Sequence, residues 1–285
     1  MSAFEYASPQ SVEEAVAILS SRSEARPLAG GQNMLLQRNR DRLKGAVLVD
    51  LGRISSLKGI DRQDGGLRIG AMATLSTIVS SDLVSKEFPA LAAAAGSIGD
   101  AQLRNRATIG GNIAEGDPEY DLPALILALD ASIQVAGSHG GRKISAQDFF
   151  NQRERRSLVP NEFVASILIP RMGPNSGMAY IRFKHPARLT AVCAVAAVVS
   201  VERDRVLAAK IGLTGAAEHP TRLEAAERAL LNGPANDELV SSVAATSDEG
   251  ITFRGDTFAS ADYRRHLTRV LTARALKQAL SQITA

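Results

Sequence analysis

The stretch "PLAGGQNMLL" (residues 27–36) places two adjacent glycines between an apolar run and a short polar amide. A second stretch, "ATIGGNIAEGD" (residues 107–117), repeats this arrangement much later in the chain. Glycine reaches φ > 0 without a Cβ penalty and lets another group approach the backbone closely. A turn whose N–H groups point inward can bind an anion, and a helix start adds free N–H groups and a positive dipole end. Together the two stretches predict a pair of loops that clamp a diphosphate.

The amides that follow each glycine pair support this interpretation. Asn33 precedes "MLLQRN" and is expected to cap a helix, whereas Asn112 can place an amide N–H₂ beside the same anion. A hydrogen bond to a charged group contributes about 1.5–3 kcal/mol, so a few of them can hold a diphosphate without Lys or Arg. One Gly-Gly pair alone would usually be only a turn. The chain shows neither a GxGxxG fingerprint after a strand nor a GxxxxGK[ST] loop.

The bulk composition describes a globular chain with room for a sizeable core. It has 285 residues, of which 45% are hydrophobic and 22% charged, and this suits one large domain or two ordinary ones. A net charge of only +3 argues against nucleic acid as a partner. The longest apolar run, "AVCAVAAVVSV", is too short to cross a bilayer, and the N-terminus lacks signal-peptide features. We therefore expect a cytoplasmic protein without a membrane span.

Metal-ligating and nucleophilic side chains form no recognisable set. The single cysteine, Cys193, lies in an apolar run and is expected to be a core thiol, so a disulfide framework or a cysteine-ligated cluster is excluded. The four histidines are scattered without metal-ligand spacing. We expect no metal site and assign no catalytic residue on this chain.

Hydrophobic periodicity predicts two lobes before residue 175. Residues 11–21 read as a helix with a capping box at Ser11 and Glu14, flanked by strands at "ARPLAG" and "AVLVDL". Further along, helices are expected at "TLSTIVSSDL", "FPALAAAAGSI" and "LPALILALDA", and strands at "GLRIGAM", "SIQVAG" and "EFVASILIP". "DRQDGG" reads as a turn. The first lobe is expected at about 1–55 and the second at 56–175.

The Gly- and Pro-containing stretch "RMGPNSG" (residues 171–177) predicts a domain boundary. Beyond it, three strands are expected at "MAYIRFKH", "AVCAVAAVVSVE" and "VLAAKIGLTGA". They are followed by helices, the first with a capping box at Thr221 and Glu224. The sequence thus predicts an α+β protein with domains at 1–175 and 176–285.

Longer stretches resemble a known family. "RPLAGGQNML" and "RNRATIGGNIAEGDPEYDLPALILALDA" resemble the two FAD-diphosphate loops in the flavin subunit of molybdenum hydroxylases, which include xanthine dehydrogenase and carbon monoxide dehydrogenase. "GAAEHPTRLEAAE" and "ASADYRRHLTRVLTARAL" resemble the C-terminal flavoprotein domain of that family. The resemblance covers nearly the whole chain. It implies a two-lobed FAD-binding domain of the PCMH type, followed by a domain like the C-terminal one of carbon monoxide dehydrogenase flavoproteins.

The resemblance also implies which residues contact FAD. Those matching the family's two loops are Ala29, Gly30, Gly31, Gln32 and Asn33, then Thr108, Ile109, Gly110, Gly111 and Asn112. Asp121 matches an acidic residue near the ribose and ribityl chain; the alternative is a helix cap before Pro123. Lys184 falls where some members place a lysine close to the flavin; the alternative is an ordinary surface lysine. Many relatives carry a small hydroxyl residue in place of Asn33.

The implied function is an electron relay. FAD would be bound non-covalently, because covalent attachment usually needs a His or Cys and neither loop contains one. The molybdenum cofactor and the two-iron two-sulfur clusters would lie on a large and a small partner subunit, in a dimer of heterotrimers. One alternative is a stand-alone FAD-dependent oxidoreductase with a related fold. The other is a nucleotide-binding assembly module without enzymatic activity.

Overall fold

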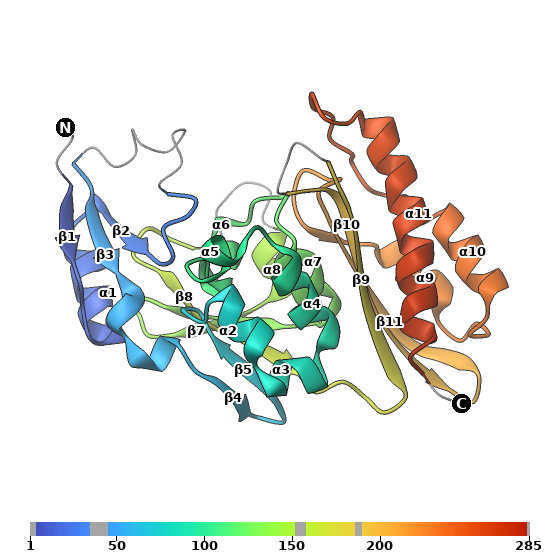
Figure 1. Ribbon diagram of the computed structural model, residues 1–285, viewed down its shortest axis with the longest axis horizontal. Helices are drawn as coiled ribbons and strands as arrows, with labels where there is room; N and C mark the ends of the chain where they lie inside the picture. The colour runs from blue at the N-terminus through green and yellow to red at the C-terminus, as the bar shows by residue number, and fades with distance from the viewer. Residues whose placement is uncertain (1–3, 35–44, 152–157, 186–189, 284–285) are drawn as a thin grey trace.

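The computed structural model describes residues 4–34, 45–151, 158–185 and 190–283. Three sheets follow one another along the long axis of the molecule, with helices packed between and beside them (Figure 1). Their strand orders are β1-β3-β2, β4-β5-β8-β6-β7 and β12-β11-β10-β9. This mixture of sheets and helices confirms the predicted α+β class. No helix within the described ranges is long and apolar enough to cross a membrane.

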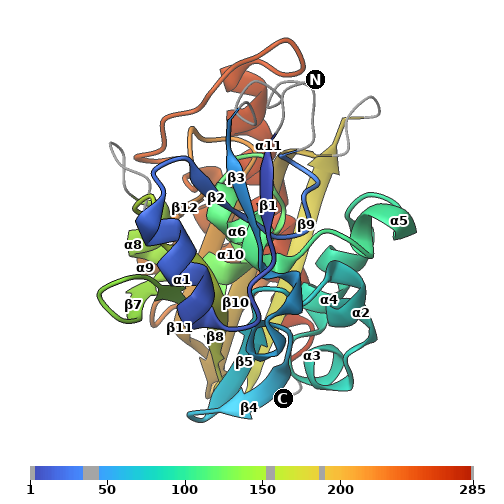
Figure 2. The same ribbon diagram turned by 90° about the vertical axis from the view of Figure 1, so that its left-hand side faces the viewer.

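The first lobe is a small parallel sheet covered by one helix, and in Figure 2 strand β3 runs between its two neighbours. Its elements are β1 (Glu5–Ala7), α1 (Val12–Ser21), β2 (Ala25–Leu28) and β3 (Val47–Asp50). Helix α1 begins as predicted, because the Ser11 hydroxyl accepts the Glu14 N–H at 3.1 Å. Ala15 and Leu19 bury the inner face of α1 in the core of this lobe.

The second lobe is an antiparallel five-stranded sheet with short helices. The strands are β4 (Ile60–Gln63), β5 (Gly66–Gly70), β6 (Ser132–Ala136), β7 (Arg142–Ser145) and β8 (Phe163–Pro170). The α-helices are α2 (Leu75–Ser80), α3 (Asp82–Glu87), α4 (Pro89–Ser97), α5 (Ala101–Arg104), α6 (Ile109–Glu115), α7 (Leu122–Ala128) and α8 (Ala146–Phe150). Two 3₁₀ turns, η2 (Leu51–Arg53) and η3 (Ser55–Leu57), join the lobes.

Two sequence predictions in this lobe need correction. "TLSTIVSSDL" forms two helices instead of one, because Ser81 ends α2 and its hydroxyl then caps α3 by accepting the Val84 N–H at 3.4 Å. "DRQDGG" is largely strand β4, and the turn is confined to Asp64 and Gly65, whose φ angles are 50° and 74°.

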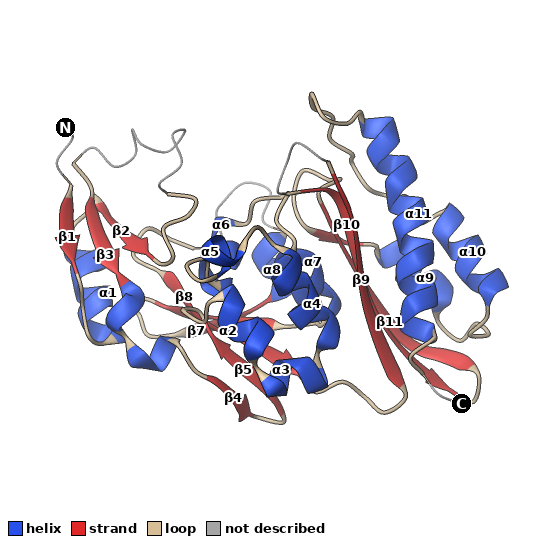
Figure 3. Ribbon diagram, in the orientation of Figure 1, coloured by secondary structure: helices blue, strands red, loops and turns tan. Residues whose placement is uncertain are grey.

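The C-terminal domain is an antiparallel sheet between helices. Its elements are β9 (Ser176–Lys184), β10 (Ala191–Glu202), β11 (Arg205–Thr214), β12 (Thr221–Arg222), α9 (Glu224–Leu230), α10 (Asp237–Ala245) and α11 (Ala261–Leu280). Figure 3 shows α10 and α11 on the outer side of this sheet and α7 on the side facing the second lobe. The predicted domain boundary falls in the turn between β8 and β9.

Three strands were expected in this domain, and the sheet has a short fourth one. Residues Thr221–Arg222 form it by pairing with β11, which removes Thr221 from the predicted capping box. Helix α9 begins after Leu223, which makes no side-chain cap hydrogen bond. Pairing with an available sheet edge therefore overrides the local capping pattern.

Helix α7 joins the two domains. All seven of its residues are buried, as its wholly apolar sequence predicts, and it packs against β10 and β11. Gly212 of β11 allows this contact, because a Cβ there would lie 2.0 Å from the carbonyl oxygen of Ala124. The core of the second lobe accordingly continues onto the C-terminal sheet through Met178 and Ala196.

Gly212 offers a test of this close packing. Gly212→Ala must push α7 away from β11, and overpacking of this kind costs about 1–3 kcal/mol, a loss that urea unfolding should show. Gly96→Ala in α4 is the matched control, since the nearest atom to its new Cβ would be a Val79 methyl 3.5 Å away. The control should keep its stability or gain up to about 1 kcal/mol. Equal stabilities for the two variants would contradict the packing described.

Candidate cofactor site

The two glycine stretches lie against each other. We call residues 29–33 the first glycine segment and residues 108–112 the second. A Cβ on Gly30 would lie 2.0 Å from the carbonyl oxygen of Arg106, two residues before the second segment. A Cβ on Gly111 would lie 3.6 Å from the Cβ of Ala29. The fold thus brings the two segments together, β2 leading into one and α6 beginning in the other (Figure 2).

The first glycine segment fits the predicted anion-binding turn. Gly31 has a φ of 75°, in the left-handed region that favours glycine. The Gln32 side chain donates to the Gly30 carbonyl at 3.3 Å. Within the described ranges, the backbone N–H groups of Gly30, Gly31 and Gln32 donate to no other residue. The helix expected after Asn33 lies mostly in residues 35–44, outside the described residues, so its capping stays a prediction.

The second glycine segment is the first turn of helix α6 instead of a loop. Thr108 caps this helix, its hydroxyl accepting the Gly111 N–H at 3.1 Å. The Ile109 and Gly110 N–H groups donate to backbone carbonyls before α2, at 3.1 and 2.9 Å, and the Asn112 N–H donates to the Thr108 carbonyl at 3.1 Å. The expectation of free backbone N–H groups at this helix start is therefore wrong.

The glycines of this segment instead allow helix α6 to pack closely against neighbouring backbone. Gly110 is buried, and a Cβ there would lie 2.4 Å from the Cβ of Ala71 and 2.7 Å from its carbonyl oxygen. This spacing lets α6 lie directly on the segment that follows β5. Neither Gly110 nor Gly111 has a positive φ.

The polar group that remains available here is the side chain of Asn112. Its Oδ1 atom is buried, and it has no hydrogen-bond partner among the residues that the structure describes. A buried polar atom left unpaired costs about 1–3 kcal/mol. Because the side-chain amide carries both an acceptor and two donors, it can satisfy a ligand at this position. The side-chain amide of Asn112, which the sequence predicts beside the anion, is thus the group that the second segment can offer to a ligand.

Asp121 is buried between the domains. Its Oδ1 accepts hydrogen bonds from the Tyr180 hydroxyl at 2.5 Å and from Arg182 Nη1 at 3.0 Å. Asp121 stands at the N-cap position of α7, as the helix-cap alternative has it, but its side chain makes no cap hydrogen bond. Burial, with the Asp121 charge adding to it, raises the pKa of Tyr180 well above its ordinary value. Arg182 also donates to the Ser97 carbonyl at 2.5 Å, so this group ties β9 to α4 and α7.

Sequence reasoning missed Tyr180 and Arg182. Both belong to β9, on either side of Ile181 in the sequence. Because side chains of a strand alternate between its two faces, both point toward the second lobe, and this alternation is the signal that could have identified them. Lys184, in contrast, lies exposed at the end of β9. Arg104 supports the loop before α5 by donating to the carbonyls of Ile98 and Gly99 at 3.1 and 3.0 Å.

Two family descriptions match the chain in succession. Residues 2–172 match "FAD binding domain in molybdopterin dehydrogenase", and residues 178–279 match "CO dehydrogenase flavoprotein C-terminal domain". The chain belongs to the FAD-binding medium subunits of the molybdenum hydroxylase family. This confirms the predicted fold, a FAD-binding domain followed by the flavoprotein C-terminal domain. It also makes the chain an oxidoreductase subunit.

Individual relatives agree over the full length. The carbon monoxide dehydrogenase medium chain of Afipia carboxidovorans is 34% identical over 97% of this chain and 96% of its own. The solved carbon monoxide dehydrogenase of Hydrogenophaga pseudoflava superposes with a TM-score of 0.92 at 35% identity, covering 99% and 98% of the two chains. Quinoline 2-oxidoreductase from Pseudomonas putida 86 gives 0.91 at 28% identity, covering 99% of both.

The residues present in this medium subunit fit the diphosphate of FAD. The first glycine segment offers backbone N–H groups, and the second offers the side-chain N–H₂ of Asn112, which lies on the same amide as the unpaired Oδ1 atom. The contact at Gly30 leaves no room for a Cβ between the segments. A dinucleotide diphosphate needs donors of this kind and close backbone approach.

Glycine substitutions test the site. Gly30→Ala should lower FAD affinity at least tenfold, because its Cβ would push against the Arg106 carbonyl and part the segments. Gly31→Ala should do likewise through strain at φ 75°, about 1–2 kcal/mol. Gly65→Ala is the control, with φ 74° but open space around it. Flavin content after purification and fluorescence titration measure the effect. Full FAD binding by both Gly30→Ala and Gly31→Ala would contradict a cofactor site at these segments.

Proposed function

We propose that this medium subunit binds FAD non-covalently and passes electrons from iron–sulfur clusters of a partner to an external acceptor. The observation that carries the proposal is the contact between the two glycine segments, in a chain whose family is FAD-binding. The isoalloxazine of FAD supplies the redox chemistry. The protein binds and orients the cofactor and contributes no acid or base.

The proposed contacts follow from what each residue offers. Backbone N–H groups of the first glycine segment and the Asn112 amide would hold the diphosphate. Asp121 would lie toward the ribityl chain and Lys184 near the ring, where a cation stabilises negative charge on the flavin. Since the Asp121 carboxylate already bonds Tyr180 and Arg182, those two side chains would fix its orientation toward the cofactor.

The electrons must come from another chain. An iron–sulfur cluster is held by several cysteine thiolates, and this chain has one cysteine. Cys193 is fully buried, and burial raises the pKa of its thiol to about 12, so it stays protonated. The proposed partners are an iron–sulfur small subunit and a molybdenum-cofactor large subunit, in a cytoplasmic dimer of heterotrimers. The names of the relatives support this, since the Afipia protein is the medium chain of a carbon monoxide dehydrogenase.

Removal of the cofactor tests how it is held. Acid precipitation of the purified protein should leave all the yellow colour in the supernatant, because nothing in either glycine segment can form a covalent bond to the flavin. Absorbance spectra of supernatant and redissolved pellet measure this. Flavin that stays with the pellet would contradict non-covalent binding.

The relay itself is tested by comparing the single chain with the complex. The isolated chain should bind FAD, yet its flavin absorbance should not bleach when small organic substrates are added anaerobically. Co-expression with the two proposed partner subunits should make the bleaching substrate-dependent. Rapid stoichiometric bleaching of the isolated chain would instead establish the stand-alone oxidoreductase, and failure to bind any flavin would favour the assembly module.

A further inference from the structure

The segment between α6 and α7 is attached to the C-terminal domain. We call residues 116–121 the linking segment, since it joins the helix that carries Asn112 to the helix that follows Asp121. The Pro118 carbonyl accepts the Gly215 N–H at 2.5 Å, and the Glu119 carbonyl accepts the Ala191 N–H at 3.3 Å. The backbone of this segment is thus bonded to the ends of β10 and β11.

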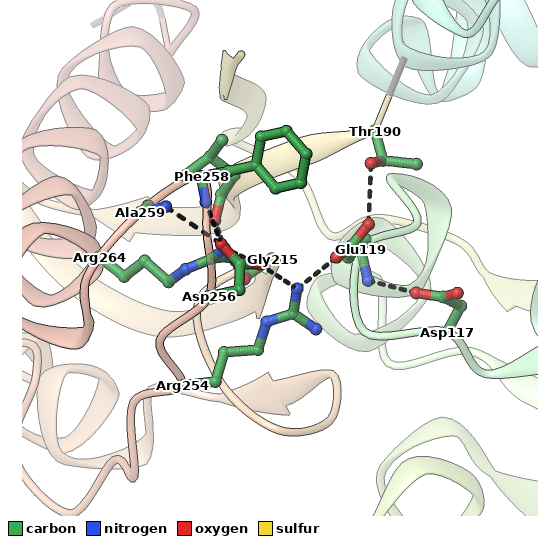
Figure 4. Close-up of polar contacts among 10 residues, drawn as sticks. Asp117, Glu119, Thr190, Gly215, Arg254, Asp256, Phe258, Ala259 and Arg264 are labelled. Carbon is green, nitrogen blue, oxygen red and sulfur yellow. Dashed lines mark hydrogen bonds and ion pairs between the residues drawn. The ribbon is translucent and has the colours of Figure 1, made fainter. Parts of the chain in front are cut away.

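The side chain of Glu119 strengthens this attachment (Figure 4). One carboxylate oxygen accepts the Thr190 hydroxyl at 2.9 Å, and the other pairs with Arg254 Nη2. Both charged side chains are largely buried, Glu119 being 12% exposed and Arg254 21%. An ion pair so shielded from water is screened less than a surface pair, so it can fix geometry.

Arg254 in turn bridges to a second carboxylate. The same Nη2 atom lies 3.1 Å from Asp256 Oδ2, and Asp256 also bonds Arg264 at 2.6 Å. Burial opposes ionisation of Asp256, yet backbone N–H groups of Phe258 and Ala259, together with Arg264, outweigh it and lower its pKa to about 2. Asp256 therefore remains charged at neutral pH and holds both guanidinium groups.

The contacts close into a ring. Arg264 is 1% exposed, and its Nη1 donates to the carbonyls of Val192, at 2.8 Å, and Gly215. Gly215 is the residue whose N–H binds Pro118. Figure 4 shows Glu119, Arg254, Asp256 and Arg264 in sequence around this ring. The charges balance, two carboxylates against two guanidinium groups.

Helix α6 is consequently fixed at its two ends by different domains. Its first turn is bonded to carbonyls of the second lobe, and the segment after its last turn is bonded to the C-terminal domain. We infer that Arg254 is a positioning residue for the cofactor, holding Glu119 so that Asn112 faces the first glycine segment. This inference rests on the proposed function, since it concerns the binding of FAD.

Loss of Arg254 should loosen the linking segment. In Arg254→Gln, Glu119 loses its ion pair and retains the Thr190 hydroxyl, while Asp256 still holds Arg264. We expect the FAD dissociation constant of the full chain to rise at least tenfold. At saturating FAD, the visible circular dichroism of the bound flavin should also change, because a shift of α6 alters the surroundings of the isoalloxazine.

Three further variants separate positioning from general stability. Arg269→Gln removes a more exposed ion pair, to Asp248, that lies away from the linking segment. It should leave FAD affinity and dichroism as in the wild type. Arg254→Lys should stay within about threefold of the wild-type affinity, because a single nitrogen of Arg254 contacts both carboxylates. Thr190→Val removes the weaker bond to Glu119 and should cost about threefold, which covers the case in which Arg254→Gln does not fold.

The outcomes are distinct. If the wild-type chain binds FAD, and FAD affinity falls in Arg254→Gln and Thr190→Val but not in Arg269→Gln, the inference is supported. If the wild-type chain binds FAD and all variants show the same affinity and dichroism, the inference is overturned and the proposed function stands. Wild-type chain that binds no FAD overturns both.

Discussion

The approach of Gly30 to the Arg106 carbonyl is the contact on which the candidate site depends. It joins the end of a parallel sheet in one lobe to the start of a helix in the next, and a Cβ at this point would lie 2.0 Å from a backbone oxygen. Because the nearest atom belongs to the backbone, it cannot move aside as the end of a flexible side chain could. The backbones of the two lobes therefore lie in direct contact. The groups that remain for a ligand are the backbone N–H groups of the first glycine segment and the Asn112 amide.

The sequence pointed to two segments that the fold does bring together, but it did not reveal which of their polar groups are already bonded within the protein. Glycine pairs are informative because few residues tolerate close backbone contact, and those at Gly30 and Gly110 indeed permit it. The roles depended on partners that local patterns do not reveal. Carbonyls of Ala71 and Ala73, distant in sequence, take the N–H groups of α6 that were assigned to an anion. The Asn112 amide, which the sequence does predict beside the anion, is the group that remains for the ligand.

The fold was predictable to a similar degree and for related reasons. A long apolar run such as β10 appears where expected, because its burial is set by many residues at once. Short elements were missed. Strand β12 exists because β11 offers an edge, and no property of Thr221 and Arg222 alone favours a strand over a helix cap. Ser81 likewise both ends one helix and begins the next, which a continuous apolar pattern conceals.

The same reasoning explains why a cofactor domain of this design carries a second domain. Helix α7 is buried on every side, so it would expose an apolar surface to water without the C-terminal sheet. The residues before it are polar and bind the C-terminal domain through Glu119 and Asp121. Apolar burial supplies most of the affinity between the domains, but it does little to fix their relative orientation, because it is non-directional. The charged and hydrogen-bonded contacts supply direction, and they act on the short segment that separates Asn112 from Asp121. Orientation of the proposed cofactor contacts is thus shared between the domains.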